Sequence, residues 1–136
     1  PYLSTVRANP AAGKILATTL DFPHIMDTVG CAPEWLKANP KAAKALADSY
    51  FEALEMIKAD PAKSNDIMGS AVKQTGEAFA KSSNYLRWQD KAANQKFFAG
   101  ELQQFMKDAA AILLEAGIIR KLPENYTAMY DDSFIK

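Results

Sequence analysis

The sequence contains one histidine and one cysteine, which are the first side chains to consider for nucleophilic chemistry. His24 and Cys31 are separated by an odd number of positions in a stretch that we expect to be extended. Alternate side chains of a strand point to opposite faces, so the imidazole and the thiol are predicted to lie too far apart for proton transfer. The pattern favours a packed thiol and an imidazole at the edge of a strand.

Acidic residues occur in pairs that could supply a general acid and a general base. Asp131 directly precedes Asp132, and Asp21 and Asp27 lie on either side of the histidine. Turn formation and solvation at strand ends explain these carboxylates more simply. The sequence also has no glycine-rich phosphate loop and no pair of cysteines with metal-binding spacing. We therefore expect no catalytic residue, no metal site and no cofactor.

The stretch RWQD, from Arg87 to Asp90, is the clearest candidate for binding a small anion. The guanidinium group of Arg87 offers a planar fork to a pair of anionic oxygens, and Trp88 offers a flat apolar wall beside it. The alternative is that the two side chains pack and cap a helix junction. Both interpretations remain open at this point.

Asn-Pro and Asp-Pro pairs divide the chain into helices, because a residue before proline avoids the helical region and proline suits a first helical turn. The pairs are Asn9-Pro10, Asn39-Pro40 and Asp60-Pro61. We expect Asn39 to act as the N-cap of a helix that runs to the third pair. The apolar residues of that helix recur at helical spacing: Ala43, Leu46, Ala47, Tyr50, Leu54 and Ile57.

The second half of the chain is predicted to be helical almost throughout. Two shorter helices should follow Pro61, with a break near residues 73–76. A long helix should then run to Gly117, a suitable C-cap, with a bend near Gly100. The tail from residue 122 is expected to be irregular and to dock through three aromatic side chains: Tyr126, Tyr130 and Phe134.

Two stretches rich in Ile, Val and Thr are the strand candidates, at residues 13–20 and 24–31. Two short strands rarely make a stable sheet by themselves. We therefore predict an α/β fold that is mostly helical, with about two strands here and the rest of the sheet before Pro1. The alternative is a self-sufficient helical bundle with a hairpin.

Charge balance and the length of the apolar runs argue against a nucleic-acid partner and a membrane span. Sixteen Lys and Arg residues balance sixteen Asp and Glu residues, so the formal net charge is zero. Nucleic-acid binding needs a basic face that displaces counterions from phosphates, and no cluster of basic residues supplies one. No apolar run approaches the roughly 18–20 residues of a membrane-spanning helix. We expect no nucleic-acid partner and no membrane span.

Four stretches carry a family resemblance: PYLSTVR at the start, APEWLKANPKAAKALADSYFEALEMI, YLRWQDKAANQKFFAGELQQFMKDAAAILLEAGII, and the closing YDDSFIK. Through them the chain resembles the C-terminal portion of periplasmic substrate-binding proteins of ABC importers. The branch it resembles is the nitrate/sulfonate/taurine type, which is related to thiamine-precursor binders. The resemblance extends over nearly all 136 residues and includes no catalytic motif.

In that family two α/β lobes, joined by crossover strands, hold a small ligand in the cleft between them. A Trp-acidic-Pro segment commonly marks the second crossover, and PYLS resembles the residues just beyond it. The resemblance thus implies that residues 1–136 are the C-terminal part of a two-lobe fold. The N-terminal part, with most of the ligand-binding residues, would be absent from this chain.

The resemblance implies a transport receptor rather than an enzyme. Its partners would be a small anionic or polar solute, an ABC-transporter permease and the missing N-terminal part, and its location would be the periplasm. The family comparison suggests five ligand-binding residues: Tyr2 beside the crossover, Asp27 and Thr28 at a strand end, and Arg87 with Trp88. Nitrate, sulfonates, amino-sulfonates, pyrimidines and aromatic acids are all bound in related branches, so the solute itself is not predicted.

Two other classes of function remain open. Pyrimidine-precursor synthases of thiamine biosynthesis share the two-lobe fold, but they depend on histidine and a cysteine-rich stretch, and this chain has one residue of each type. A helical interaction module would instead expose a large apolar stripe and bind a protein partner without a small ligand.

Overall fold

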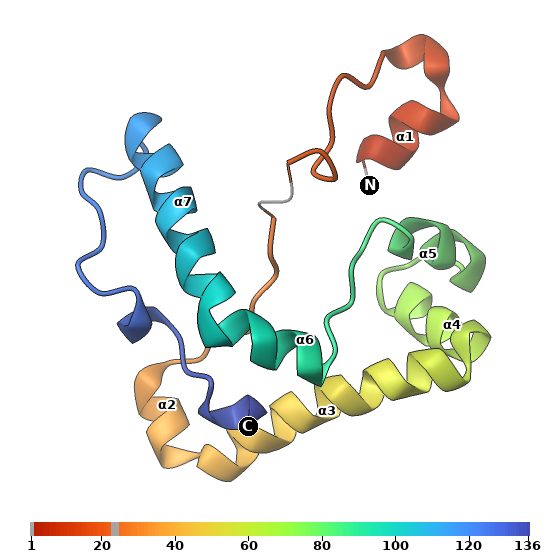
Figure 1. Ribbon diagram of the computed structural model, residues 1–136. Coiled ribbons are helices and arrows are strands. Elements are labelled where there is room, and N and C mark those ends of the chain that lie inside the picture. The colour runs from red at the N-terminus through yellow and green to blue at the C-terminus, as the bar shows by residue number, and fades with distance from the viewer. Residues whose placement is uncertain (1, 23–24) are drawn as a thin grey trace. The chain divides into compact units, whose positions relative to one another are not determined.

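The computed structural model describes residues 2–22 and 25–136, although the side chains of Tyr2, Ser4 and Thr5 lie outside the description. Figure 1 shows the chain as a series of helices joined by irregular segments. In chain order the elements are α1 (Tyr2–Ala8), η1 (Pro10–Ala12), α2 (Pro33–Ala38), α3 (Pro40–Ala59), α4 (Pro61–Ala71), α5 (Gly76–Ser83), α6 (Lys91–Lys96), η2 (Phe97–Glu101), α7 (Leu102–Glu115), η3 (Thr127–Met129) and η4 (Ser133–Ile135).

The predicted α/β fold with about two strands is wrong. The structure is 64% helix and has no strand and no sheet among the described residues. The described parts of the two strand candidates, 13–20 and 24–31, are irregular or turn backbone and are not paired as strands. A strand needs a paired neighbour for its N–H and C=O groups, and a high content of Ile, Val and Thr does not supply one.

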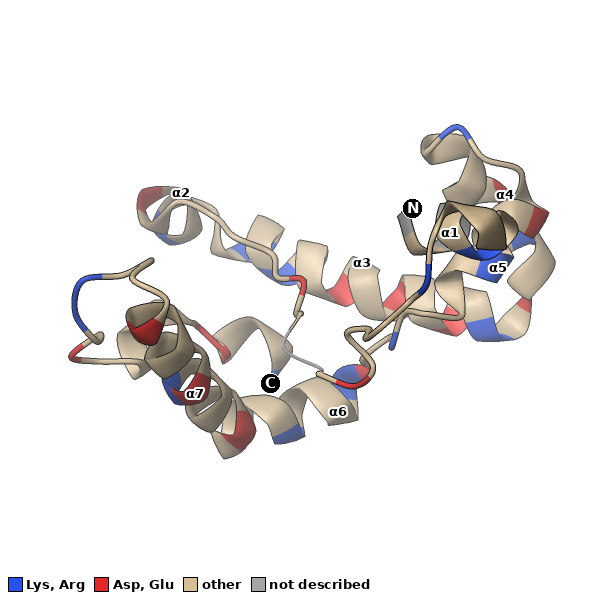
Figure 2. Cartoon of the chain, turned by 90° about the horizontal axis from the view of Figure 1, so that it is seen from above, with Lys and Arg blue, Asp and Glu red and all other residues tan. Residues whose placement is uncertain are grey.

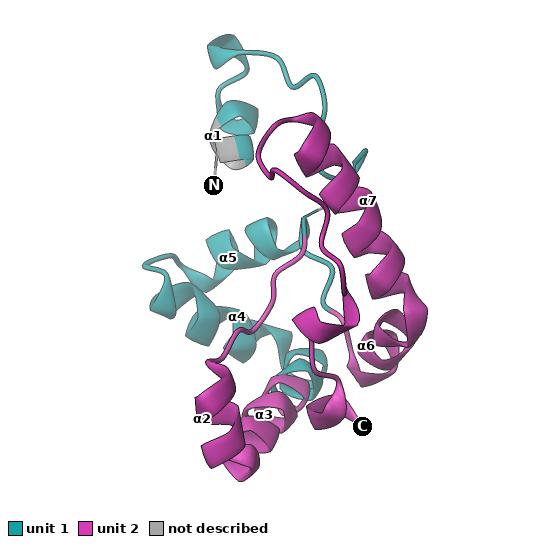
Figure 3. Ribbon diagram, turned by 90° about the vertical axis from the view of Figure 1, so that its left-hand side faces the viewer, with its two compact units in different colours: residues 1–25, 53–88 teal, residues 26–52, 89–136 magenta. Residues whose placement is uncertain are grey.

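The chain divides into two units, which Figure 3 colours separately. Unit 1 consists of residues 1–25 and 53–88, and unit 2 consists of residues 26–52 and 89–136. The chain passes from one unit to the other three times, and one of these passages falls within α3. Each unit is described by itself below.

Local capping explains where α4 and α5 of unit 1 begin. The Asp60 carboxylate accepts a hydrogen bond from the Lys63 N–H at 3.1 Å, and Pro61 occupies the first turn of α4. The Thr75 hydroxyl accepts one from the Ala78 N–H at 3.2 Å at the start of α5. Each cap satisfies one of the N–H groups that a helix start leaves without a partner. The predicted boundary at Asp60-Pro61 is confirmed.

Asn39 lies directly before α3, at the predicted N-cap position, and also takes part in the end of α2. Its backbone N–H and its side-chain amide both donate to the Trp35 carbonyl, at 2.9 and 3.0 Å. The side chain therefore closes α2, while the Asn39 carbonyl accepts from the Ala43 N–H at 3.0 Å as α3 begins.

Helices α4 and α5 form a tight hairpin in unit 1. Lys73 in the connecting turn has a φ of 59°, a left-handed conformation that costs energy for any residue with a side chain. The Gln74 N–H donates back to the Gly69 carbonyl at 2.8 Å. A Cβ added to Gly69 would lie 2.9 Å from the Thr75 carbonyl oxygen, so the turn approaches α4 more closely than a side chain allows. The predicted break near residues 73–76 is confirmed.

In unit 2 the predicted long helix is interrupted at the predicted place. Gly100, within η2, has non-helical angles (φ 167°, ψ −34°). The helix resumes as α7 and ends at Glu115. Gly117 follows with a φ of 70°, and the Ile118 N–H donates to the Leu113 carbonyl at 2.9 Å. This is the left-handed helix ending that the sequence predicts for Gly117.

Few apolar side chains are enclosed within the described chain. The buried hydrophobic residues are Ala43, Leu54, Leu102 and Ala110. Many larger ones are exposed, among them Leu16 at 88%, Val29 at 77% and Ile118 at 69%. Burial of apolar area is the main favourable term in folding, and in the described chain many large apolar side chains are left exposed.

Candidate functional site

Arg7 and Tyr85 form the contact that joins α1 to the segment after α5 within unit 1. The guanidinium carbon of Arg7 lies 4.7 Å from the centroid of the Tyr85 ring, and Arg7 Nη1 donates a hydrogen bond to the Tyr85 hydroxyl oxygen. A cation over an aromatic face is attracted by the ring quadrupole, which holds the guanidinium plane in place. The fork carries several N–H donors, so the bond to Tyr85 leaves others for a further acceptor.

The segment that carries Tyr85 also carries two predicted site residues. Arg87 and Trp88 follow in the irregular stretch between α5 and α6, and both are exposed, Trp88 at 41%. We refer to Arg7, its contact partner Tyr85, and Arg87 and Trp88, which follow Tyr85 closely in the chain, as the Arg–aromatic cluster. All four belong to unit 1. Guanidinium groups beside aromatic rings are suited to small ligands that have an anionic group and a flat or apolar body.

The last residue of RWQD has the capping role that the sequence left open. The Asp90 carboxylate accepts a hydrogen bond from the Ala93 N–H at 2.8 Å and starts α6. The Asn94 amide donates to the Gln89 and Asp90 carbonyl oxygens, at 2.9 and 3.0 Å. Asp90 therefore acts as the N-cap of α6.

The other predicted site residues lie elsewhere. The side chain of Tyr2 is outside the described residues. Asp27 and Thr28 are exposed in an extended stretch of unit 2, and no strand end forms there. Arg87 and Trp88 belong to unit 1, so they are described separately from Asp27 and Thr28.

Turns account for two of the carboxylates considered for acid–base chemistry. Asp21 accepts hydrogen bonds from the Thr18 N–H at 2.8 Å and the Thr18 hydroxyl at 3.1 Å, and these bonds lower its pKa. Hydrogen bonds from the hydroxyl and N–H of Ser133 likewise lower the pKa of Asp131. Donors that favour the charged form keep both groups ionised near neutral pH, which does not suit a general acid.

Cys31 is a free, exposed thiol, while His24 lies outside the described residues. Among the residues that the structure describes, no three His, Cys, Asp or Glu side chains gather closely enough to hold a metal ion. Within the same residues, no helix is both long enough and apolar enough to cross a membrane. Charges of both signs occur along α3 and α7 (Figure 2).

Arg7 and Tyr85 were not predicted as site residues. They are 78 positions apart, and no periodic pattern or short motif connects them. Comparison with protein-family models, curated proteins and solved structures finds no match for this sequence.

Proposed function

We propose that the chain is part of the substrate-binding component of an ABC importer. In this role it captures a small anionic or polar solute and delivers it to a membrane permease, and its location is the periplasm. The proposal extends the resemblance carried by the sequence.

The contact between Arg7 and Tyr85 is the observation that supports this proposal best. Arg7 ends PYLSTVR and Tyr85 begins YLRWQD, two of the stretches that resemble substrate-binding proteins. The fold brings these stretches into contact although they are 78 positions apart. A pairing between the resembling stretches is expected if they form one side of a ligand site.

The residues of the Arg–aromatic cluster would have distinct roles in such a site. Arg87 would bind the anionic oxygens through its planar fork, and Trp88 would cover the body of the solute. Tyr85 would orient Arg7 so that its remaining donors face the same ligand. A site built in this way has a few convergent polar groups and aromatic walls, as is usual for small-molecule sites.

The transport mechanism follows from differential affinity. A receptor that closes around its solute binds the solute more tightly in the closed form, so the solute shifts the population toward that form. The permease then recognises the closed form. In this mechanism the chain performs no chemical step, and its specificity depends on the few groups that touch the solute.

A thermal-shift screen tests the proposal directly. The panel contains nitrate, an alkyl sulfonate, taurine, a pyrimidine and an aromatic acid, each with a salt control of equal ionic strength. A ligand at a hundred times its dissociation constant should add about 2.7 kcal/mol to the free energy of unfolding. The proposal predicts such a shift for at least one compound and its loss in Arg87→Ala. Absence of a shift across the panel contradicts it.

A helical interaction module is the second candidate, and α7 provides the observation that favours it. Ile112, Leu113 and Leu114 are consecutive and are 52%, 36% and 38% exposed. Consecutive helical residues point in different directions, so α7 is apolar on more than one face, which is typical of a covered helix. This candidate predicts that copies of the chain associate with one another through α7 as the protein concentration rises, measured by sedimentation, and that Ile112→Glu abolishes this association. It also predicts that no solute on the panel stabilises the chain.

A further inference from the structure

The helix that spans α6 and α7 changes direction within η2 (Figure 1). The Leu102 N–H donates to the Phe97 carbonyl, five residues back, where a regular α-helix bonds four residues back. Gly100 between them has non-helical angles. A Cβ added there would enter open space, so the position has room for a side chain. Such π-type interruptions are a recognised cause of kinks and are frequent at functional positions.

Two side-chain contacts within the helix adjoin the bend. Lys96 Nζ lies 3.1 Å from a carboxylate oxygen of Glu101, and these side chains are 78% and 55% exposed. Exposed ion pairs contribute little because water and salt screen them. Phe97 and Phe105 meet edge to face at 6.2 Å, a contact between η2 and α7 that does not involve α6.

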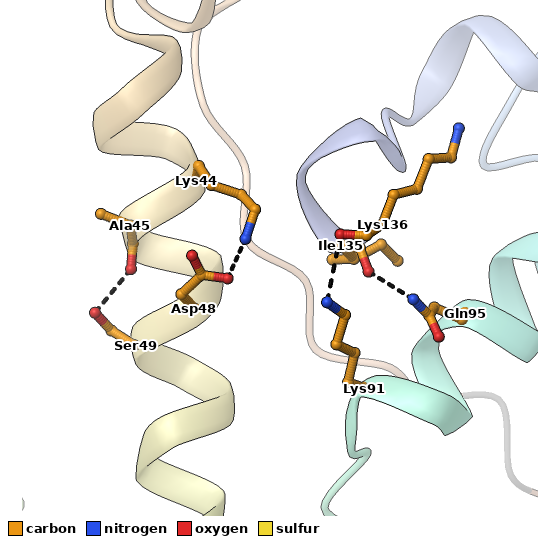
Figure 4. A network of polar contacts seen from close by, with 8 residues as sticks. All are labelled: Lys44, Ala45, Asp48, Ser49, Lys91, Gln95, Ile135 and Lys136. Carbon is orange, nitrogen blue, oxygen red and sulfur yellow. Dashed lines mark hydrogen bonds and ion pairs between the residues drawn. The ribbon is translucent and has the colours of Figure 1, made fainter.

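The C-terminal tail, which follows α7 in the chain, returns to contact η2 and α6. Tyr130 packs edge to face on Phe98 in η2, with ring centroids 5.5 Å apart. The Gln95 amide of α6 donates to the Ile135 carbonyl at 3.0 Å (Figure 4). In the same view Lys91 Nζ donates to the Lys136 carbonyl at 3.3 Å. The tail is therefore joined to α7 by the chain and to α6 by these contacts.

We propose that η2 is a hinge between α6 and α7, and that the C-terminal tail is the tether that sets its angle. With the tail docked on α6, the two helices are held in the bent arrangement. With the tail released, the helices sample a wider range of angles. This inference concerns unit 2 alone and does not depend on the proposed solute.

The anchors of the tether suit reversible docking. Lys91 and Gln95 are exposed, and each makes its tail contact through one long side chain. Tyr130, the aromatic anchor on the tail, is half-buried. A segment held by a few accessible contacts opens at a lower free-energy cost than a packed core does. Moving elements are found among such weakly held segments.

Distance measurements between spin labels on α6 and α7 test the inference. Cys31, the one cysteine, is replaced first (Cys31→Ser), and labels are attached at Ala92→Cys and Ala111→Cys, two exposed positions. A straight helix would place these positions roughly 28 Å apart, at about 1.5 Å per residue, which pulsed electron paramagnetic resonance can measure. The reference is the doubly labelled chain with an intact tail.

The expected result is a distance distribution about twofold broader in Tyr130→Ala and in Gln95→Ala than in the reference. Met129→Ala is the matched control, because Met129 neighbours Tyr130 and is 60% exposed. This control should leave the distribution unchanged. Adding Gly100→Ala, which favours a regular helix and has room for its methyl group, should narrow the distribution again.

Two results would overturn the tether. One is an unchanged distribution in Tyr130→Ala and Gln95→Ala, and the other is equal broadening in Met129→Ala. Far-ultraviolet circular dichroism of each variant checks that helix content is kept. If Tyr130→Ala loses helix, the decision rests on Gln95→Ala, which alters an exposed side chain.

Discussion

The guanidinium group of Arg7 lies over the ring of Tyr85 and donates to its hydroxyl, which connects two stretches that are 78 positions apart. A cation–aromatic contact at an exposed site contributes about 0.5–1 kcal/mol. Arg7→Ala should lower the free energy of unfolding by about that amount, measured by urea titration. Tyr85→Phe keeps the ring and removes the hydroxyl, so it should cost less. Arg120→Ala, at an exposed arginine, is the control.

If Arg7→Ala and Arg120→Ala have equal effects, the contact contributes nothing specific, and the geometric basis of the Arg–aromatic cluster is lost. A larger effect of Tyr85→Phe than of Arg7→Ala would also contradict the account.

Gly69 should not tolerate a side chain. Its added Cβ would lie 2.9 Å from the Thr75 carbonyl oxygen and 3.0 Å from that of Gln74, and backbone atoms cannot move aside as a flexible side chain can. Gly69→Ala should therefore destabilise the chain by about 1–3 kcal/mol in thermal or urea unfolding. Gly13→Ala is the control, because no atom lies within 4 Å of the added Cβ. Equal effects of the two changes would contradict the tight hairpin.

Lys73 is a position where glycine should stabilise the protein. Its φ of 59° is left-handed, and L-residues with a Cβ lose roughly 1–2 kcal/mol there. Lys73→Gly should raise the free energy of unfolding by about 0.5–1 kcal/mol, since greater freedom of the unfolded chain offsets part of the gain. Lys73→Ala keeps the Cβ and should give no such gain. A loss of stability in Lys73→Gly would contradict the assigned turn.

Helix ends were predictable because their causes are local. Asp60-Pro61 specifies a cap and a first turn within a few residues, and Gly117 permits the left-handed ending. Whether residues 13–20 and 24–31 form strands could not be decided in that way. A strand exists only with a paired neighbour, and the position of that neighbour depends on the whole fold. The contact of Arg7 with Tyr85 was missed for the same reason, since distance along the chain hides it.

The pH dependence of stability should include a contribution from Asp131. Hydrogen bonds from Ser133 lower its pKa from the ordinary value of 3.8, so the folded state binds the proton less readily than the unfolded state. The stability that this carboxylate adds is present above 3.8 and is lost as the pH falls through the lowered folded pKa. Urea titrations at about pH 5 and about pH 3 should differ less in Asp131→Asn than in the parent. An equal or larger difference would contradict this assignment.

The fluorescence of Trp88 tests the central claim, the capture of a small solute by the Arg–aromatic cluster, most directly. In a Trp35→Phe background Trp88 is the remaining tryptophan, and at 41% exposure its emission should respond to a ligand laid against it. We predict saturable quenching or a spectral shift with at least one solute of the panel. The affinity obtained from this titration should fall at least about tenfold in Arg87→Ala and stay unchanged in Arg120→Ala. No saturable response to any panel member, or the same affinity in Arg87→Ala as in the parent, would contradict the claim.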